Sequence, residues 1–385
     1  MNICIATEGY PYAEDSQFAF VEQLCVAMSK QNVNVTIISP QSWFHIVLGK
    51  DKAHPQYRID QKGGVPIHVY RPLFILAPYR FWRFNDFSFK LAVTRQFKKL
   101  KTTFDVCYGH FWNNAYYISG VAKKNNIPLF VASGEGNFDD LTKKYKSKTY
   151  QSFSKNVRGV ICVSSSCRDI SVEYGLTTKD KCIVAPNSID ETLFKVMDKR
   201  QLREKYGYPT DAFIIAFVGG LINRKGSNRV SEAVKILAEE GIKVNSIFIG
   251  KGQGPENLVP DCEGVLHCGP VEHSRIPEYL NMADVFVLPT LNEGCCNAII
   301  EAMACGLPII SSDKPFNYDV LNESNSILVD PNNVPEIASA IKKVYLDEEL
   351  RSKMSNSAIE TAKGLTIDKR AKKIISYIKD IIATK

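Results

Sequence analysis

The sequence has no hydrophobic run long enough to cross a bilayer. Its longest near-apolar stretch, residues 213–222, spans ten residues, whereas a membrane-spanning helix needs about 20. The amino-terminal segment lacks the basic region and the long apolar region of a signal peptide. No two of the 11 cysteines are spaced as CxxC, and several lie in apolar segments, which favours buried, reduced thiols over disulfides or a zinc site. We therefore expect a cytoplasmic protein.

What the sequence does contain is typical of a globular protein with two domains. Its 385 residues are 45% hydrophobic and 23% charged, and this length exceeds what one hydrophobic core usually organises. Residues 1–185 carry 24 Lys and Arg against 14 Asp and Glu, whereas the remaining residues carry 24 against 27. The asymmetry predicts two domains with different tasks and an anionic partner for the first. The alternative is chance variation in surface charge.

Short apolar segments alternate with helical patterns along both halves of the chain. The expected strands are 3–6, 33–38, 67–70, 106–108, 129–132, 160–163 and 183–184 in the first half, and 214–218, 246–249, 265–267, 285–288, 309–310 and 327–328 in the second. Strands separated by helices indicate parallel βαβ units. We predict an α/β protein with two Rossmann-like, doubly wound domains, 1–187 and 188–365, that face each other across a cleft. Ligands of such sheets bind at the carboxyl ends of the strands.

Two glycine-rich loops follow strands in the second half. Residues 250–254 read GKGQG, which lacks the third spacing of a dinucleotide-binding loop and the acidic residue expected further on, so NAD binding is not expected. The other loop begins with Gly219 and Gly220 and places Arg224 and Lys225 before a predicted helix. Cations and glycine amides beside a helix start suit a diphosphate. The alternative is a strand–helix turn with exposed basic residues.

The segment 288–310 carries the strongest signal. Glu293 follows a strand and precedes a predicted helix, and Glu301 lies on that helix. The free backbone amides at the helix start favour an anion; they belong to Cys295, Cys296, Asn297 and Ala298. Up to about 12 Å of helical rise separates the two glutamates, which is too far to share a proton or a metal. They suit two hydroxyl-rich groups on either side of a phosphate, as in a sugar–diphosphate–ribose ligand; the alternative is two surface glutamates on a capped helix.

These residues carry a family resemblance. The stretch EGCCNAIIEAMACGLPI, residues 293–309, resembles the E-x7-E signature of the retaining GT-B glycosyltransferases of family 4, also called glycosyl transferases group 1. Supporting matches are FVGGLINRKG, PNSID, VSSS, and CGPV followed by ADVFVLPT, over about residues 160–330. The first half matches only in pattern. The resemblance implies a GT-B architecture in which the carboxy-terminal helix, here 366–385, packs back on the first domain.

The resemblance also implies roles for the residues singled out above. Glu301 would hold the ribose of a nucleotide, and Glu293 would hold the hydroxyls of the donor sugar. Arg224 and Lys225 would bind the diphosphate, next to Gly219, Gly220 and the amides of residues 295–298. This assignment agrees with the layout inferred from charge and helix amides.

Two positions depart from the family pattern. Many members have arginine directly after the first glycine of the FVG strand end, where this chain has Gly220. Many members also carry a histidine after a strand of the first domain, and the residue nearest that place here is Glu135. Glu135 either accepts a hydrogen bond from the reacting sugar or acceptor, as a catalytic residue would, or is a loop residue. His110, one strand earlier, is a weaker candidate.

The resemblance implies a retaining hexosyltransferase. The protein would move a hexose-type sugar from a nucleotide-diphosphate donor, of UDP or GDP type, to a hydroxyl of a glycan or lipid-linked acceptor, in cell-surface polysaccharide synthesis. No carboxyl pair at the roughly 5 Å separation of a retaining glycosidase is evident, so retention would be a same-face substitution. No DxD motif or His/Asp cluster is evident, so neither a metal nor a cofactor besides the nucleotide sugar is expected. A sugar-nucleotide epimerase and a non-catalytic nucleotide-sugar-binding partner are the alternatives.

A basic, aromatic segment lies at residues 71–104. Its eight cations are Arg71, Arg80, Arg83, Lys90, Arg95, Lys98, Lys99 and Lys101, and among them lie Phe74, Tyr79, Phe81, Trp82, Phe84, Phe87 and Phe89. A second basic cluster follows at Lys143, Lys144, Lys146 and Lys148. This composition suits an anionic membrane surface, so we expect peripheral binding at the inner face of the membrane; the alternative is that the aromatic residues fill the core. No nucleic-acid-binding module is recognisable, so no nucleic-acid partner is expected.

Overall fold

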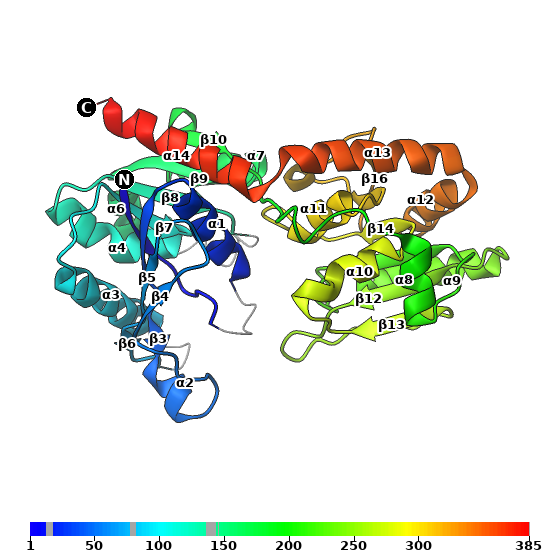
Figure 1. The fold of residues 1–385 in the computed structure, drawn as a ribbon, viewed down its shortest axis with the longest axis horizontal. Coiled ribbons are helices and arrows are strands. Elements are labelled where there is room, and N and C mark those ends of the chain that lie inside the picture. The colour runs from blue at the N-terminus through cyan, green and yellow to red at the C-terminus, as the bar shows by residue number, and fades with distance from the viewer. Residues whose placement is uncertain (13–17, 78–81, 136–143, 145, 385) are drawn as a thin grey trace. The chain divides into compact units, whose positions relative to one another are not determined.

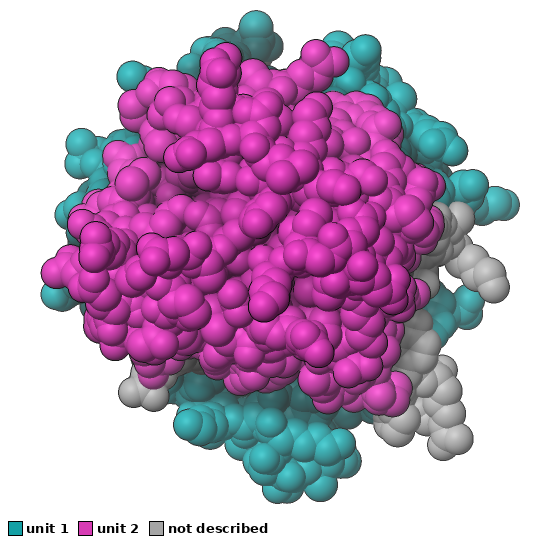
Figure 2. All heavy atoms as spheres, turned by 90° about the vertical axis from the view of Figure 1, so that its right-hand side faces the viewer, with its two compact units in different colours: residues 1–185, 367–385 teal, residues 186–366 magenta. Residues whose placement is uncertain are grey.

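The computed structural model describes residues 1–12, 18–77, 82–135, 144 and 146–384. The chain forms two compact units, which Figure 2 distinguishes by colour. Unit 1 joins residues 1–185 to residues 367–385, and unit 2 consists of residues 186–366. The boundaries expected from the sequence, after 187 and after 365, lie within two residues of these divisions.

Unit 1 is built on an eight-stranded sheet with the order β10-β9-β8-β7-β1-β2-β5-β4. Its strands are β1 (Asn2–Ala6), β2 (Asn34–Ile38), β4 (Tyr57–Asp60), β5 (Ile67–Tyr70), β7 (Val106–His110), β8 (Leu129–Ser133), β9 (Val157–Cys162) and β10 (Cys182–Val184). All neighbours pair in parallel except β4, which runs antiparallel to β5 at the sheet edge. The central strands are buried, continuous apolar runs, as parallel sheets covered on both faces require.

Helices cover both faces of this sheet (Figure 1). The helices of unit 1 are α1 (Ala19–Lys30), α2 (Trp43–Val47), α3 (Trp82–Lys99), α4 (Trp112–Lys124), α6 (Lys148–Ser154), α7 (Ser165–Glu173) and α14 (Ile367–Ala383). The unit also has a small parallel sheet of β3 (Gln41–Ser42) and β6 (Leu73–Phe74) and the 3-10 turn η3 (Lys179–Lys181). Ile3 and Ile5 belong to a core that α1 and α14 complete. On the other face α4 lies so close that a Cβ on Gly109 would be 2.2 Å from the backbone nitrogen of Ala115.

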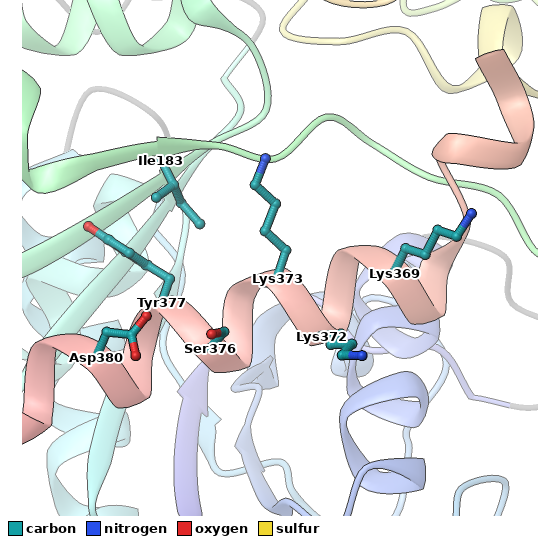
Figure 3. Close-up of a pocket in the computed structure, with 7 residues that line it drawn as sticks. All are labelled: Ile183, Lys369, Lys372, Lys373, Ser376, Tyr377 and Asp380. Carbon is teal, nitrogen blue, oxygen red and sulfur yellow. The ribbon is translucent and has the colours of Figure 1, made fainter.

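The last helix of the chain, α14, is part of unit 1. It packs against α1 and β9, and its Tyr377 hydroxyl donates a hydrogen bond to the Lys181 carbonyl at 2.6 Å. A Cβ on Gly159 of β9 would lie 2.6 Å from the same hydroxyl, so glycine is required for this close approach. Figure 3 shows Tyr377 beside a shallow pocket along α14 that is lined by Ile183 and by lysines of the helix.

Unit 2 is built on a six-stranded, fully parallel sheet with the order β13-β12-β11-β14-β15-β16. The strands are β11 (Ile214–Val218), β12 (Asn245–Ile249), β13 (Val265–Gly269), β14 (Val285–Leu288), β15 (Ile309–Ser312) and β16 (Ser326–Val329). The helices are α8 (Lys199–Tyr206), α9 (Ser227–Glu239), α10 (Ile276–Asn281), α11 (Asn297–Ala304), α12 (Val334–Leu346) and α13 (Glu348–Gly364), with 3-10 turns η4 (His273–Arg275) and η5 (Pro315–Asn317).

The expected α/β class with two Rossmann-like domains is confirmed. Every strand expected from the sequence is present, with ends that differ by up to three residues. The sequence analysis missed β4, the β3–β6 sheet and the short helices α2 and α8, because these elements are short and their residues are of mixed polarity. In the described parts of the chain, no helix combines the length and the apolar character needed to span a bilayer.

The basic, aromatic segment 71–104 is divided between core and surface. Trp82, Phe84 and Phe87 are exposed, whereas Phe89 is buried and packs against Phe74 with ring centroids 5.0 Å apart. Counting Arg71 as a surface cation was wrong, because its side chain is only 2% exposed. The residues Arg80, Tyr79, Phe81 and Lys143 of the sequence-based prediction lie outside the described part of the chain.

Candidate functional site

Two strand–helix loops meet at the carboxyl ends of β11 and β14 in unit 2. These two strands are neighbours in the sheet, so the loops that follow them lie side by side. The Leu291 backbone N–H donates to the Arg224 carbonyl at 2.8 Å, and the Arg224 side chain donates to the Asn292 carbonyl at 2.8 Å. The loop that carries the two cations is thereby joined to the loop that carries the first glutamate.

Glu293 is the centre of this arrangement. Its Oε1 accepts hydrogen bonds from Arg224 at 3.0 Å, from Lys225 at 2.5 Å and from the Thr290 hydroxyl at 2.9 Å. The Glu293 side chain is 12% exposed and that of Lys225 is 14% exposed, so the charges interact where water screens them little. Burial alone would lower the pKa of Lys225, but the neighbouring Cys296 and Glu293 raise it above its usual value. Lys225 is therefore cationic at neutral pH.

Glu301 lies about one turn into helix α11, which begins at Asn297. Its Oε1 is 3.5 Å from Nε2 of His273 in turn η4. The hydrogen bond and charge of Glu301, followed by the charge of Asp190, raise the pKa of His273 although burial opposes this. The sequence analysis did not single out His273, which lies two residues after the family-like CGPV match. A polar residue so close to a matched motif was the available signal.

The start of helix α11 is shaped by Cys296. This residue precedes the helix with an extended backbone and provides no oxygen cap, and the N–H groups of Ala298 and Ile299 approach its sulphur. Burial raises the pKa of the Cys296 thiol to about 11, although Lys225 opposes the rise, so the thiol is neutral. Oδ1 of Asn297 is buried without a hydrogen-bond partner. The helix start therefore combines an uncharged thiol with backbone donors and a nearby ammonium group.

Glycines allow the loops to approach each other closely. Gly250 has φ of 155°, and a Cβ there would lie 1.8 Å from the carbonyl oxygen of Gly219. Gly226 has φ of 85° and would meet the Arg229 side chain at 2.6 Å. Arg229, which sequence reasoning missed, donates to the Pro289 carbonyl at 2.8 Å and to Oδ1 of Asn223 at 2.9 Å. It holds the cationic loop against the end of β14.

Glu135 lies in unit 1 and has different partners. Its Oε1 accepts a hydrogen bond from the Trp112 backbone N–H at 2.8 Å, and its Oε2 accepts from the Gly134 N–H at 3.0 Å and from Ser133 at 3.3 Å. The carboxylate therefore caps the start of α4, where Phe111 takes a left-handed φ of 76° and offers no cap of its own. These contacts favour the interpretation of Glu135 as a loop residue that positions backbone. The neighbouring residues 136 and 137 lie outside the described part of the chain.

His110 is a buried residue at the end of β7. It is 4% exposed, and it contacts Phe20 and Phe111 with ring centroids 5.4 and 4.9 Å away. Burial, with a further contribution from Arg370 of α14, lowers its pKa to about 3. The imidazole is therefore neutral at physiological pH. Among the described residues, no group of three or more His, Cys, Asp or Glu is arranged to hold a metal ion.

The fold and the matching family models define a glycosyltransferase of GT-B architecture. The family model for glycosyl transferases group 1 matches residues 198–361, and that for glycosyltransferase family 4 matches residues 18–193. The chain belongs to this family, the family 4 glycosyltransferases, and is a transferase enzyme.

Named relatives and solved structures agree with this membership. The chain is 24% identical over 376 residues to a protein of Bacillus subtilis named as the teichuronic acid biosynthesis glycosyltransferase TuaC, with 94% of each chain covered. It is 26% identical over 318 residues to an Escherichia coli UDP-Gal:alpha-D-GlcNAc-diphosphoundecaprenol alpha-1,3-galactosyltransferase, with 78% of this chain and 81% of the relative covered. The fold is similar to sucrose-phosphate synthase of Thermosynechococcus elongatus, with a TM-score of 0.81, 17% identity and 100% of both chains covered. It is also similar to Anabaena HepE crystallised with UDP, with a TM-score of 0.74, 15% identity and coverage of 99% and 100%.

Proposed function

We propose that the protein transfers a hexose-type sugar from a UDP- or GDP-type donor to a hydroxyl of a glycan or lipid-linked acceptor, with retention, in cell-surface polysaccharide synthesis. The observation that carries the proposal is the contact of Arg224 and Lys225 with Glu293 beside the helix that bears Glu301. The names of the relatives support it, since one uses UDP-galactose and a diphosphoundecaprenol acceptor, and another is named for teichuronic acid.

Binding of the donor would exchange partners within this cluster. In the free protein Glu293 forms ion pairs with both cations. A diphosphate would take over Arg224 and Lys225, because its oxygens form charge-assisted hydrogen bonds with both. Glu293 would then turn to the hydroxyls of the donor sugar, and Glu301 would accept hydrogen bonds from the ribose. The exchange of Glu293 for the diphosphate would keep both cations paired, and the sugar hydroxyls would supply hydrogen bonds to the released carboxylate.

The same cations would act in the chemical step. Breaking the bond between the sugar C1 and the phosphate oxygen places negative charge on the leaving diphosphate and positive charge on the sugar ring. Arg224, Lys225 and the backbone donors near Cys296 would stabilise the leaving group, an effect that fixed donors supply efficiently because they need no reorganisation. The departing phosphate oxygen would accept the proton of the acceptor hydroxyl, which attacks C1 from the same face. The step needs no carboxylate nucleophile on the protein.

Product stereochemistry and metal dependence test this proposal. The purified protein is incubated with UDP- and GDP-hexoses, with and without polyprenyl diphosphate sugars, in the presence of EDTA. We expect transfer only when an acceptor is present, and NMR of the new linkage should show the anomeric configuration of the donor. An altered donor sugar without an acceptor would indicate an epimerase, and an inverted linkage or loss of activity in EDTA would contradict the mechanism.

A matched pair of variants tests the nucleotide assignment. Glu301→Gln should weaken UDP or GDP binding about tenfold or more, because hydrogen bonds to a charged acceptor are lost. Glu240→Gln removes a carboxylate from an exposed ion pair with Lys342 in the same unit and serves as the control. Calorimetry should find the control unchanged. Equal affinity in both variants would contradict the assignment of Glu301 to the ribose.

The proposal includes docking of unit 1 on an anionic membrane. Trp82, Phe84 and Phe87 are exposed on α3, and the exposed cations of the same segment are Arg83, Arg95, Lys98, Lys99 and Lys101. Helix α2 adds exposed Trp43 and Phe44. Strand β3, which precedes α2, pairs with β6, and this pairing brings the start of α2 close to exposed Leu73. Aromatic residues at headgroup depth and cations near anionic lipid are typical of peripheral binding.

Vesicle sedimentation tests the docking. Binding should require phosphatidylglycerol and should fall with added salt, since interfacial charge is screened within about 8–10 Å. Arg83→Glu combined with Lys98→Glu and Lys99→Glu should release the protein. The control is Lys235→Glu, an exposed cation of unit 2 paired with Asp261. Equal recovery of the protein in the soluble fraction with neutral and anionic vesicles would exclude docking on the membrane. The acceptor would then be a soluble one.

A further inference from the structure

Unit 1 contains a cavity of about 930 Å³ that the sequence analysis did not find. Its wall comes from four separate parts of the chain: the loop after β1, the segment 39–54 after β2, the end of β5 with β6, and helices α3 and α4. The cavity is large enough for a ligand of one or two sugar rings. Its lining is polar and aromatic, with Arg71 among the lining residues.

Arg71 is a buried cation with an unused hydrogen-bonding group. It is 2% exposed, and its Nη2 donates to the backbone carbonyls of Tyr10 and Pro11 at 3.0 and 3.2 Å. Its Nη1 is buried and has no hydrogen-bond partner. Within the described part of the chain, no carboxylate lies within ion-pair distance of Arg71, and burial together with the charge of Arg58 lowers the pKa of its guanidinium to about 10. A buried, unpaired charge is costly, so this position suits a ligand that supplies the missing anion.

The surroundings of Arg71 would admit and hold such an anion. The ring of half-buried Tyr12 lies over the guanidinium at 5.7 Å, and His54 packs on the same ring at 4.9 Å. The Tyr12 ring therefore lies against the guanidinium at the cavity wall. Lys50, Asp51 and Lys52 also line the cavity and are exposed, so this part of the wall carries a net positive charge.

Another part of the wall suits a sugar. Asp86 of α3 lines the cavity. It accepts a hydrogen bond from the Tyr117 hydroxyl at 2.6 Å and forms an ion pair with Lys144. Phe89 packs on Tyr117 with ring centroids 4.6 Å apart, and both rings line the cavity. Carboxylates that accept from hydroxyls and aromatic faces that pack against C–H groups together fit a pyranose ring.

We propose that this cavity binds the acceptor and selects one that carries an oxyanion, a carboxylate or a phosphate, which pairs with Arg71. The inference rests on the proposed function, because it names the substrate class of the transfer. Nη1 of Arg71 can donate a charge-assisted hydrogen bond to either group, while Nη2 keeps its backbone partners. An acidic sugar acceptor is thereby preferred over its neutral counterpart.

Three probes that differ only at C6 test the selection: methyl glucoside, its 6-carboxylate and its 6-phosphate. Calorimetry on the full chain should show that one or both charged probes bind about tenfold or more tightly than the neutral probe. Arg71→Gln should remove this preference and leave neutral binding within twofold, and Arg71→Lys should keep part of it. Arg158→Gln, an exposed arginine of unit 1, is the control. The charged probe with the higher affinity shows whether the preferred acceptor carries a uronate or a phosphate.

Two further variants keep the test decisive. If Arg71→Gln does not fold, Lys50→Gln combined with Lys52→Gln should still reduce the preference several-fold, since both side chains are exposed. Arg224→Ala combined with Lys225→Ala should leave probe binding unchanged, which excludes binding at the cations of unit 2. Equal affinity of all three probes for the wild type, or a preference retained in Arg71→Gln, would overturn the inference. Absence of sugar transfer to every acceptor would instead overturn the proposed function, because probe binding is measured without transfer.

Discussion

Glu135 in unit 1 and Glu293 in unit 2 occupy similar places with different partners. Each follows a buried parallel strand and precedes or contacts a helix start. Glu293 receives hydrogen bonds from the side chains of Arg224, Lys225 and Thr290, whereas Glu135 receives hydrogen bonds from the backbone N–H groups of Trp112 and Gly134. A carboxylate held by cationic side chains can exchange them for a ligand, but one that satisfies backbone groups is bound into the fold. The two positions therefore predict different responses to substitution.

The largest effect is expected at the partners of Glu293. Arg224→Ala combined with Lys225→Ala should lower kcat by about 10²–10³, the loss typical of removing fixed donors from a developing anion. The nucleotide affinity should fall less, because these cations act most strongly on the leaving group. Steady-state kinetics and calorimetry measure the two quantities. Lys199→Ala, which removes an exposed cation paired with Asp284, is the control. An unchanged kcat in the double variant of Arg224 and Lys225 would contradict the assignment of these cations to the leaving diphosphate.

Replacement of Glu293 itself should separate binding from turnover. Glu293→Gln removes the anion that occupies the two cations, so UDP or GDP without a sugar should bind equally well or a few-fold more tightly. Turnover should nevertheless fall about 10²-fold, because the donor sugar loses its charged hydrogen-bond acceptor. Calorimetry with the free nucleotide and initial rates with the donor measure the two effects. Parallel loss of both would show that Glu293 acts only as a structural ion-pair partner.

This contrast also indicates what the sequence could predict. The strands of both units were recognisable because parallel, buried strands are continuous apolar runs, and Glu293 and Glu301 were recognisable because they share one short segment. His273 and Arg229 were missed, since their partners Glu301 and Pro289 lie far from them in sequence. Glu135 was identified, but its hydrogen bonds with the start of α4 depend on the pairing of β7 with β8. The cavity of unit 1 was missed for the same reason: its lining comes from four separate segments.

A smaller effect on activity is expected at Glu135. Glu135→Ala should destabilise unit 1 by about 1–2 kcal/mol, the usual consequence of removing a helix cap, while the rate per folded molecule stays within a few-fold of wild type. Urea unfolding and active-site-normalised rates distinguish the two quantities. Glu173→Ala, at the end of α7, is a control carboxylate of the same unit. A hundredfold loss of turnover at unchanged stability would make Glu135 a catalytic residue and would remove the contrast with Glu293.

The smallest effect is expected at the ion pair of Glu301 with His273. Glu301 raises the pKa of His273 in the folded protein, so the protonated imidazole stabilises unit 2. This contribution is complete below the unfolded pKa of about 6.5 and disappears as the pH rises through the folded value. Because His273 is 33% exposed, the contribution should stay below about 1 kcal/mol. NMR titration should show that Glu301→Gln lowers the pKa of His273, whereas the control Glu240→Gln leaves this pKa unchanged. Bound nucleotide should also lower the pKa of His273, because the ribose would take over Glu301. An unchanged pKa in Glu301→Gln would show that the two side chains do not interact in solution, and an unchanged pKa with nucleotide would place the ribose elsewhere.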